Sequence, residues 1–495
     1  MSFYTGRYVH SHGSSWNEVP LKVGELTLGD HLRPLGMECV LVGKTHMKAD
    51  DEGMARLGIS RDTVIGARVA ECGFDVFERD DGTRPEGPDG LYDPRGGAVY
   101  NGYLRARGYS STNPWHDFAN SGRDANGEML SGWFLKNARV PTAISEDDSE
   151  TPYMTGRAIE FMEQAQGKRW CLHLSYIKPH WPYIAPAPYN SLYGPEHVLP
   201  AIRSEGERIT AHPVFKAFMD GQIGRTFSRD DVRETVIPAY MGLITQCDDQ
   251  MGRLFKYLEG VGRIDDTLIV LTSDHGDYLG DHWLGEKDLF HEPSVKIPLI
   301  IVDPRREADA TRGTVCDEIV EAIDLAATFV DAAAGEPRPH ILEGRSLLPF
   351  VQGATLTTWR DFAISEYDYS ITPAAARLGV VPSEAHLFMV VDKRWKFMHA
   401  EKFGPQLFDL RNDPCELNDL AGDPANKATI EQMYDRLSTW ARRQSQRTTH
   451  SDDEMRERRG RSMRRGVTLG VYDGTEISEE LTIRYRGIPR VSSDQ

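Results

Sequence analysis

The sequence predicts an α/β fold, with a large, mostly parallel sheet flanked by helices and a small C-terminal antiparallel sheet with one helix. Two observations lead to this prediction. Apolar runs alternate with helical segments up to about Gln352, as expected for a parallel sheet covered on both faces. Beyond that point short strands follow one another directly, which is typical of an antiparallel sheet.

The strands of the large sheet are expected at short apolar runs, namely 38–42, 170–176, 267–271 and 297–302. Helices are expected around them, at 26–32, 152–166, 240–258 and 317–333. Thr151 is the predicted N-cap of the second helix, and the third has apolar residues at helical spacing. Two polar segments, 73–150 and 177–236, are too long for simple connections, so we expect insertions around a site.

The small sheet is expected from four runs, 362–365, 387–391, 395–398 and 406–410, with a helix at 426–442. The chain thus divides into a catalytic α/β domain at 1–355, an α+β subdomain at 356–445 and an arginine-rich tail at 446–495. Nine arginines occur within 442–465. On an acidic chain we expect them to dock on an acidic surface, its own or that of a neighbouring subunit, and we expect a homo-oligomer.

Composition narrows the function classes. The chain has 495 residues and a net charge of −18, which argues against nucleic-acid binding and means that an anionic substrate needs a local positive pocket. No apolar stretch approaches the ~20 residues of a membrane span, so no membrane association is expected. Six scattered cysteines without a C-x-x-C pair predict free thiols and a cytoplasmic location.

The most informative run is Thr272–His282, which follows the apolar run 267–271. Ligands bind outside the carboxyl ends of strands in open α/β sheets. Asp274 and His275 stand at such an end, where both can converge on one divalent ion. Mixed carboxylate and imidazole ligation suits Mn, Fe or Zn, whereas a carboxylate-rich site suits Ca or Mg. Two ligands do not make a site, so other carboxylates must come from elsewhere.

Two further strand ends carry a lysine and a histidine. Lys44 and His46 follow the strand that ends at Gly43, and Lys178 and His180 follow the strand 170–176 in a loop stiffened by prolines. An ammonium and an imidazole there can bind sulfate or phosphate oxygens. His180 can also protonate a leaving oxygen, since its ordinary pKa is near neutrality.

These motifs together resemble the sulfatase family of the alkaline phosphatase superfamily, and within it the bacterial branch of phosphonate monoester hydrolases and cytosolic arylsulfatases. The matching segments span most of the chain, at 5–8, 43–46, 178–182, 240–249, 273–277, 287 and 407–420. The resemblance implies that Asp274 and His275 bind the metal, with Ca or Mn expected. It implies that Lys44, His46, His180 and Lys287 bind the substrate oxygens and assist the leaving group, and that Asn17 contacts substrate.

The resemblance also implies a formylglycine nucleophile, which the family makes from the first residue of a Cys/Ser-x-Pro-x-Arg motif. That motif runs into a four-residue stretch and then Thr-Gly. Here Met1–Tyr4 is the four-residue stretch and Thr5-Gly6 follows. We therefore expect the nucleophile, its Arg and the first metal-binding strand to lie upstream of Met1, and we expect the chain as written to bind metal poorly and not to turn over.

Three functions stay open on the sequence. The first is hydrolysis of a small sulfate ester, favoured because phosphonate hydrolases of this branch carry hydroxyl side chains where Lys44 and His46 stand. The second is hydrolysis of a phosphonate monoester or phosphodiester. The third is a catalytically inactive relic that acts as a binding protein.

Overall fold

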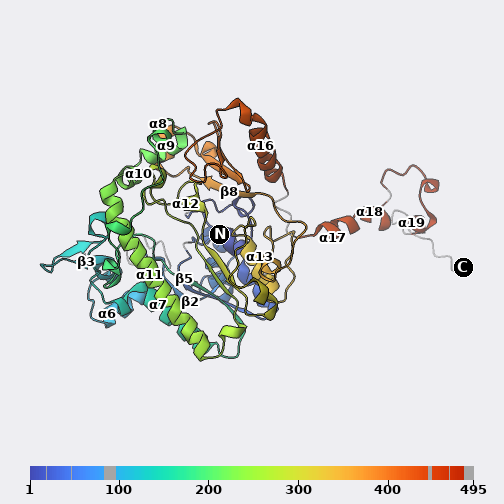
Figure 1. Cartoon of the computed structure of the whole chain (residues 1–495). Helices are drawn as coiled ribbons and strands as arrows, with labels where there is room; N and C mark the ends of the chain where they lie inside the picture. Colours follow the sequence, from blue (N-terminus) through green and yellow to red (C-terminus); the bar gives the residue numbers. More distant parts are fainter. Residues whose placement is uncertain (18, 46, 83–95, 444–448, 468, 484–495) are drawn as a thin grey trace.

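The computed structural model describes residues 1–17, 19–45, 47–82, 96–443, 449–467 and 469–483. A three-stranded parallel sheet lies in its main body (Figure 1), in the order β2 (Asp75–Arg79), β1 (Glu38–Gly43) and β5 (Trp170–Ser175). The residues from Cys39 to Val42 are at most 5% exposed, so both faces of the middle strand are covered. This is the parallel, doubly covered sheet that the sequence predicts.

One face of the sheet is covered by three helices, α1 (Ser2–Thr5), α3 (Leu28–Leu32) and α13 (Asp324–Ala332). Cys39 and Leu41 of β1 pack there with Leu32 and Val330. The predicted helix 317–333 is shorter in the structure and begins at Asp324. The carboxylate of Asp324 accepts a hydrogen bond from the backbone N–H of Glu321, which lies in the loop before the helix.

The opposite face is covered by α7 (Glu150–Gln164) and α11 (Asp230–Gly260). The prediction of Thr151 as N-cap is wrong, since Ser149 takes that position and Thr151 lies within the first turn. Pro152 also lies in that turn, where its missing N–H leaves no hydrogen bond unmade. Helix α11 begins well before Tyr240, the predicted start, and continues through Pro238.

The predicted strands 267–271 and 297–302 do not join the parallel sheet but pair with each other. They are β6 (Ile269–Thr272) and β7 (Leu299–Val302), which run antiparallel. Among the described strands, β5 pairs only with β1, and β6 only with β7. Every residue of β5 and β6 is partly exposed although both strands are largely apolar, so each has an open edge.

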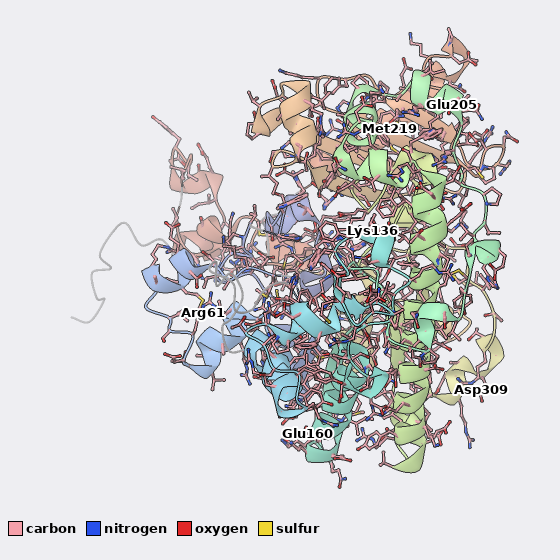
Figure 2. All side chains as sticks on the ribbon, turned by 90° about the vertical axis from the view of Figure 1, so that its left-hand side faces the viewer. Arg61, Lys136, Glu160, Glu205, Met219 and Asp309 are labelled. Carbon is pink, nitrogen blue, oxygen red and sulfur yellow. The ribbon has the colours of Figure 1, made fainter. Side chains whose placement is uncertain are left out.

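The C-terminal sheet is antiparallel, as predicted. Its order is β11 (Gln406–Asp409), β10 (Trp395–Ala400), β9 (His386–Val391) and β8 (Ala363–Asp368). Helix α16 (Lys427–Ala441) covers one face through Met433, Leu437 and Trp440. The other face packs against α9 (Pro213–Met219) and the loop after β6, and Met219, labelled in Figure 2, belongs to this packing.

The remaining short elements are α2 (Val9–His12), α4 (Asp51–Arg56), α5 (Val64–Ala70), α6 (Gly96–Ala106), α8 (Glu205–Ile209), α10 (Gln222–Phe227), α12 (Glu292–Val295), α14 (Leu348–Val351), α15 (Pro373–Leu378), β3 (Ser121–Arg123) and β4 (Met129–Ser131). Three helices of the tail project from the main body in Figure 1, namely α17 (Asp452–Glu457), α18 (Arg461–Arg464) and α19 (Glu479–Ile483). None of the helices in the described ranges is both long and apolar enough to cross a bilayer.

Candidate active site

Three strand ends bring the candidate residues to one region. Lys44 directly follows β1, His180 lies in the loop after β5, and Asp274 and His275 follow β6. Lys287 reaches the same region from the loop that follows. Lys44 and His180 lie at the carboxyl edge of the parallel sheet, where α/β proteins bind ligands, and the turn after β6 is next to them, with the rings of His180 and His275 in proximity.

Asp274 and His275 form a pair of potential metal ligands. The Nε2 atom of His275 is 3.5 Å from Oδ2 of Asp274, and Nδ1 lies 2.7 Å from the carbonyl oxygen of Gly276. Since only a protonated Nδ1 can donate to that carbonyl, the lone pair of a neutral ring is on Nε2, beside the carboxylate. A backbone carbonyl commonly fixes the tautomer of a ligating histidine in this way.

His180 and Lys287 are in direct contact. Nε2 of His180 lies 3.0 Å from Nζ of Lys287, and its Nδ1 lies 3.0 Å from the carbonyl oxygen of Trp181. The ring therefore donates from Nδ1 and accepts the lysine N–H at Nε2. Burial and then the charges of Lys287 and Lys44 lower the pKa of His180 to about 2, so this histidine is neutral.

The Asp274–His275 pair and the His180–Lys287 pair are close enough to affect each other's pKa values. The ring centroids of His180 and His275 are 5.9 Å apart. The side chain of Asp274 is 72% exposed. The protein around the carboxyl group removes part of its hydration, which raises its pKa. The charges of His275, Lys44 and Lys287 have the larger effect, so the pKa is lowered overall. Burial lowers the pKa of Lys44, which is 8% exposed, while Asp274 opposes that shift.

The start of the chain lies beside the same pair. Burial lowers the pKa of the Met1 amino group, and the Cys72 and Asp274 charges oppose this effect. The hydroxyl of Tyr4 lies 3.2 Å from Nε2 of His173 on β5. The Met1 amino group is therefore close enough to Asp274 to be affected by its charge, and Met1 itself contacts Cys72, with 3.4 Å between the two sulfur atoms.

Two further site residues were predicted, His46 and Asn17. His46 lies outside the described residues. Asn17 is exposed, on a loop in which the neighbouring Trp16 packs on Tyr367 of β8 with ring centroids 5.7 Å apart. Their roles stay predictions.

Three buried charged residues lie behind the cluster, and of these the sequence pointed only to Lys178, at the same strand end as His180. Lys178 is directed away from the cluster, since Nζ donates to Asn120 Oδ1 at 3.0 Å and to the Pro182 carbonyl at 2.7 Å. Burial raises the pKa of Asp80 well above its usual range and that of Glu150 to about 7, although Lys178 and Lys44 lower the latter. The sequence offered one further signal that was missed, namely that Asp80 directly follows β2.

A second histidine-containing group lies nearer the C-terminal sheet. Candidate ligand atoms of Glu207, His282 and His291 all lie within 4.8 Å of one another. The two imidazole rings are stacked, with centroids 3.8 Å apart and an interplanar angle of 4°. Imidazole lone pairs lie in the ring plane, so parallel rings do not direct two of them at one ion. The group is therefore a hydrogen-bonded network, with His282 Nδ1 at 2.5 Å from Glu207 Oε1.

The donors at the sheet edge fit a divalent ion only in part. Asp274 and His275 present one oxygen and one nitrogen close together, but Ca²⁺ takes about 6–8 oxygen ligands and Mn²⁺ also prefers a fuller set. The surrounding charges of Lys44 and Lys287 repel a cation. As described, the site suits an anion better than a metal ion.

Comparison with known proteins assigns this chain to a family. Residues 101–336 match the model described as Sulfatase, and residues 280–443 match that described as N-sulphoglucosamine sulphohydrolase, C-terminal. The chain is 32% identical to the multifunctional alkaline phosphatase superfamily protein PehA of Trinickia caryophylli, over 91% of this chain and 85% of the relative. It is 27% identical to an arylsulfatase of Clostridium perfringens, over 59% of this chain and 58% of that protein.

The fold agrees with these matches. The structure superposes on the phosphonate monoester hydrolase of Silicibacter pomeroyi with a TM-score of 0.75 and 26% identity, over 89% of this chain and 84% of that one. Fold and site together define a hydrolase of ester bonds. The chain belongs to the sulfatase family of the alkaline phosphatase superfamily.

Proposed function

We propose that the protein hydrolyses small sulfate esters. The observation that carries the proposal is the meeting of Lys44, Lys287 and His180 around Asp274 and His275, with the His180–Lys287 contact at 3.0 Å. Two ammonium groups and an imidazole converging on one point bind a tetrahedral anion. On a chain with a net charge of −18, such a local positive site is what an anionic ester needs.

Each residue has a distinct role in this proposal. The ammonium of Lys287 donates one N–H to His180 and has others left for a substrate oxygen. Lys44, being buried, binds an oxygen in a region of low dielectric, where its charge acts strongly. Neutral His180 donates its Nδ1–H to the Trp181 carbonyl and accepts the Lys287 N–H at Nε2, so it orients the ammonium group that can pass a proton to the leaving oxygen. The proton that reaches the leaving oxygen then comes from the Lys287–His180 pair.

Asp274 and His275 are the proposed metal ligands, with calcium or manganese as the expected ion. A bound divalent ion would neutralise ester oxygens and orient the nucleophile. Since these two donors do not complete a site, we propose that the remaining carboxylates come from a segment upstream of Met1, together with the formylglycine nucleophile. Among the described strands, β5 pairs only with β1 and β6 only with β7, so each has an edge at which a further strand could pair, which supports this proposal.

Phosphonate monoesters are the second candidate substrate. The structural likeness to a phosphonate monoester hydrolase favours them, and a sulfuryl and a phosphonyl group present similar oxygens. Lys44 favours sulfate, because the phosphonate hydrolases that this chain resembles carry a hydroxyl side chain there.

Steady-state kinetics on an aryl sulfate and a phenyl phosphonate test this proposal. The protein is assayed as written and in a version extended in frame upstream of Met1. We expect the extended version to turn over both esters, with the larger kcat/KM on the sulfate, and the chain as written to be inactive. A larger kcat/KM on the phosphonate would reverse the substrate assignment, and equal rates for the two versions would overturn the upstream nucleophile. A stop codon directly upstream would favour the inactive relic.

A further inference from the structure

A lysine of the C-terminal sheet is completely buried between two carboxylates. Lys396, on β10, is 0% exposed. Its Nζ lies 2.6 Å from Oε1 of Glu292 and 2.7 Å from Oε1 of Glu416. The backbone N–H of Glu292 also donates to Oε2 of Glu416 at 2.7 Å. These three residues, the Lys396 triad, join the C-terminal sheet to helix α12.

Helix α12 in turn contacts both halves of the candidate active site. The Ser294 hydroxyl donates to the backbone carbonyl of Lys287 at 2.5 Å. The backbone N–H of Gly276 donates to the carbonyl of Ser294 at 2.8 Å. Gly276 is the residue whose carbonyl orients His275. One short helix therefore holds the peptide of Lys287 and the turn of the proposed metal ligands.

Close packing makes this connection stiff. A Cβ atom at Gly276 would lie 1.9 Å from the carbonyl oxygen of Pro293, so the turn and α12 are in backbone contact without a side chain between them. Close-packed groups transmit a displacement because no space absorbs it. If α12 shifts, the turn that carries Asp274 and His275 must shift with it.

We propose that Lys396 is a positioning residue: its buried charge fixes α12, and through α12 it holds Lys287 and the Asp274–His275 turn in place. A buried ammonium is strongly unfavourable without partners, so the lysine fixes both glutamates at one point. Burial raises the pKa of Glu416 even though Lys396 lowers it, so removing the lysine leaves excess buried acid next to α12. The catalytic consequence rests on the proposed function, whereas the mechanical connection does not.

Hydrogen exchange of the full chain, read by mass spectrometry, tests the connection without any substrate. The variant is Lys396→Met, and the matched control is Arg360→Met. Arg360 is also a buried cation between two carboxylates, Glu321 and Asp324, but those lie at α13. We expect exchange in peptides covering 273–296 to accelerate about tenfold or more in Lys396→Met and to stay within about twofold of wild type in Arg360→Met.

A second variant separates positioning from simple destabilisation. Lys396→Met/Glu416→Gln removes one buried charge of each sign, so we expect its Tm to recover toward that of wild type while exchange at 273–296 stays fast. It also serves if the single variant does not fold. Wild-type exchange at 273–296 in the folded variants would overturn the proposal.

Steady-state kinetics test the catalytic consequence of the proposal. In a version that hydrolyses aryl sulfate, we expect Lys396→Met to lower kcat about tenfold with a smaller change in KM, since a displaced Lys287 stabilises the transition state less. If no version hydrolyses an ester, the proposed function fails, but the exchange result still decides the positioning role. Unchanged kcat together with fast exchange would confine Lys396 to a structural role.

Discussion

Lys287 sets the protonation of its neighbour at the residue scale. Its Nζ is 3.0 Å from His180 Nε2, and after burial its charge is the largest cause that lowers the pKa of His180 to about 2. A histidine held neutral in this way accepts a proton only when an anion compensates the lysine charges. The contact thus couples binding of an anionic ester to the readiness of His180 for proton transfer.

We predict that Lys287→Met raises the pKa of His180. The substitution removes a positive charge that disfavours the imidazolium, whereas the remaining burial and Lys44 still lower the pKa. NMR titration of the His180 ring resonances measures it, with His197→Gln, at a half-exposed ring, as an assignment control. An unchanged His180 pKa would mean that the contact carries no electrostatic coupling.

Glu150 gives a second prediction, on stability against pH. Burial raises its pKa from 4.5 to about 7, so the folded protein keeps this proton over a pH range in which the unfolded chain has lost it. Its contribution to stability therefore falls as the pH rises from about 4.5 to about 7. We expect Glu150→Gln to gain stability relative to wild type between pH 5 and pH 8, by about 1–3 kcal/mol in urea unfolding. A difference independent of pH would contradict the raised pKa.

At the scale of elements, the turn after β6 depends on the absence of a side chain at Gly276. A Cβ there would meet the Pro293 carbonyl oxygen at 1.9 Å, whereas at Gly252 in α11 nothing lies within 4 Å. We predict that Gly276→Ala destabilises the protein by about 2–4 kcal/mol and weakens anion binding. Gly252→Ala should stabilise it by up to about 1 kcal/mol, because alanine favours helix. Equal effects in thermal unfolding would contradict the close contact.

The sequence could predict most strands and helices because each has a local signal. The four strands of the C-terminal sheet and α16 are confirmed with bounds close to those expected, since short, largely apolar runs mark the strands. The antiparallel pairing of β6 with β7 was missed, because an apolar run does not encode the direction of its neighbour. The start of α11 was missed because Pro238 resembled a helix boundary.

The site was partly predictable for the same reason. Lys44 and His180 follow neighbouring strands of the parallel sheet, so its topology brings them to one edge, whereas Asp274 and His275 follow a strand of the β6–β7 pair and meet His180 through tertiary packing. Lys178 has the same kind of position, yet its ammonium is directed to Asn120, because side-chain direction in a loop is set by tertiary packing. The Lys396 triad had no sequence signal at all, since its three residues lie on separate elements.

At the scale of the whole molecule, the tail differs from the rest of the chain. Helices α17–α19 lie apart from the main body in Figure 1, and Leu469 and Tyr472 are 90% and 93% exposed. The segment 442–465 is rich in arginine on a chain of net charge −18. We propose that this tail binds the acidic body of a second copy.

Deletion of residues 445–495 tests this proposal. We expect the mass in solution, measured by light scattering, to fall to that of a monomer, and the full-length oligomer to weaken at high salt because exposed charges are screened. A body that keeps its own oligomeric state after deletion would contradict the role of the tail.

We propose that the cluster of Lys44, His180, Lys287, Asp274 and His275 is the active site of a sulfate ester hydrolase. The most direct test is kcat/KM for an aryl sulfate in the version extended upstream of Met1, compared between wild type and Lys287→Met. Since one preorganised donor to a developing anion contributes about 10²–10³ in rate, the account predicts a loss of at least about a hundredfold in the variant. Equal kcat/KM values for the two proteins would contradict it.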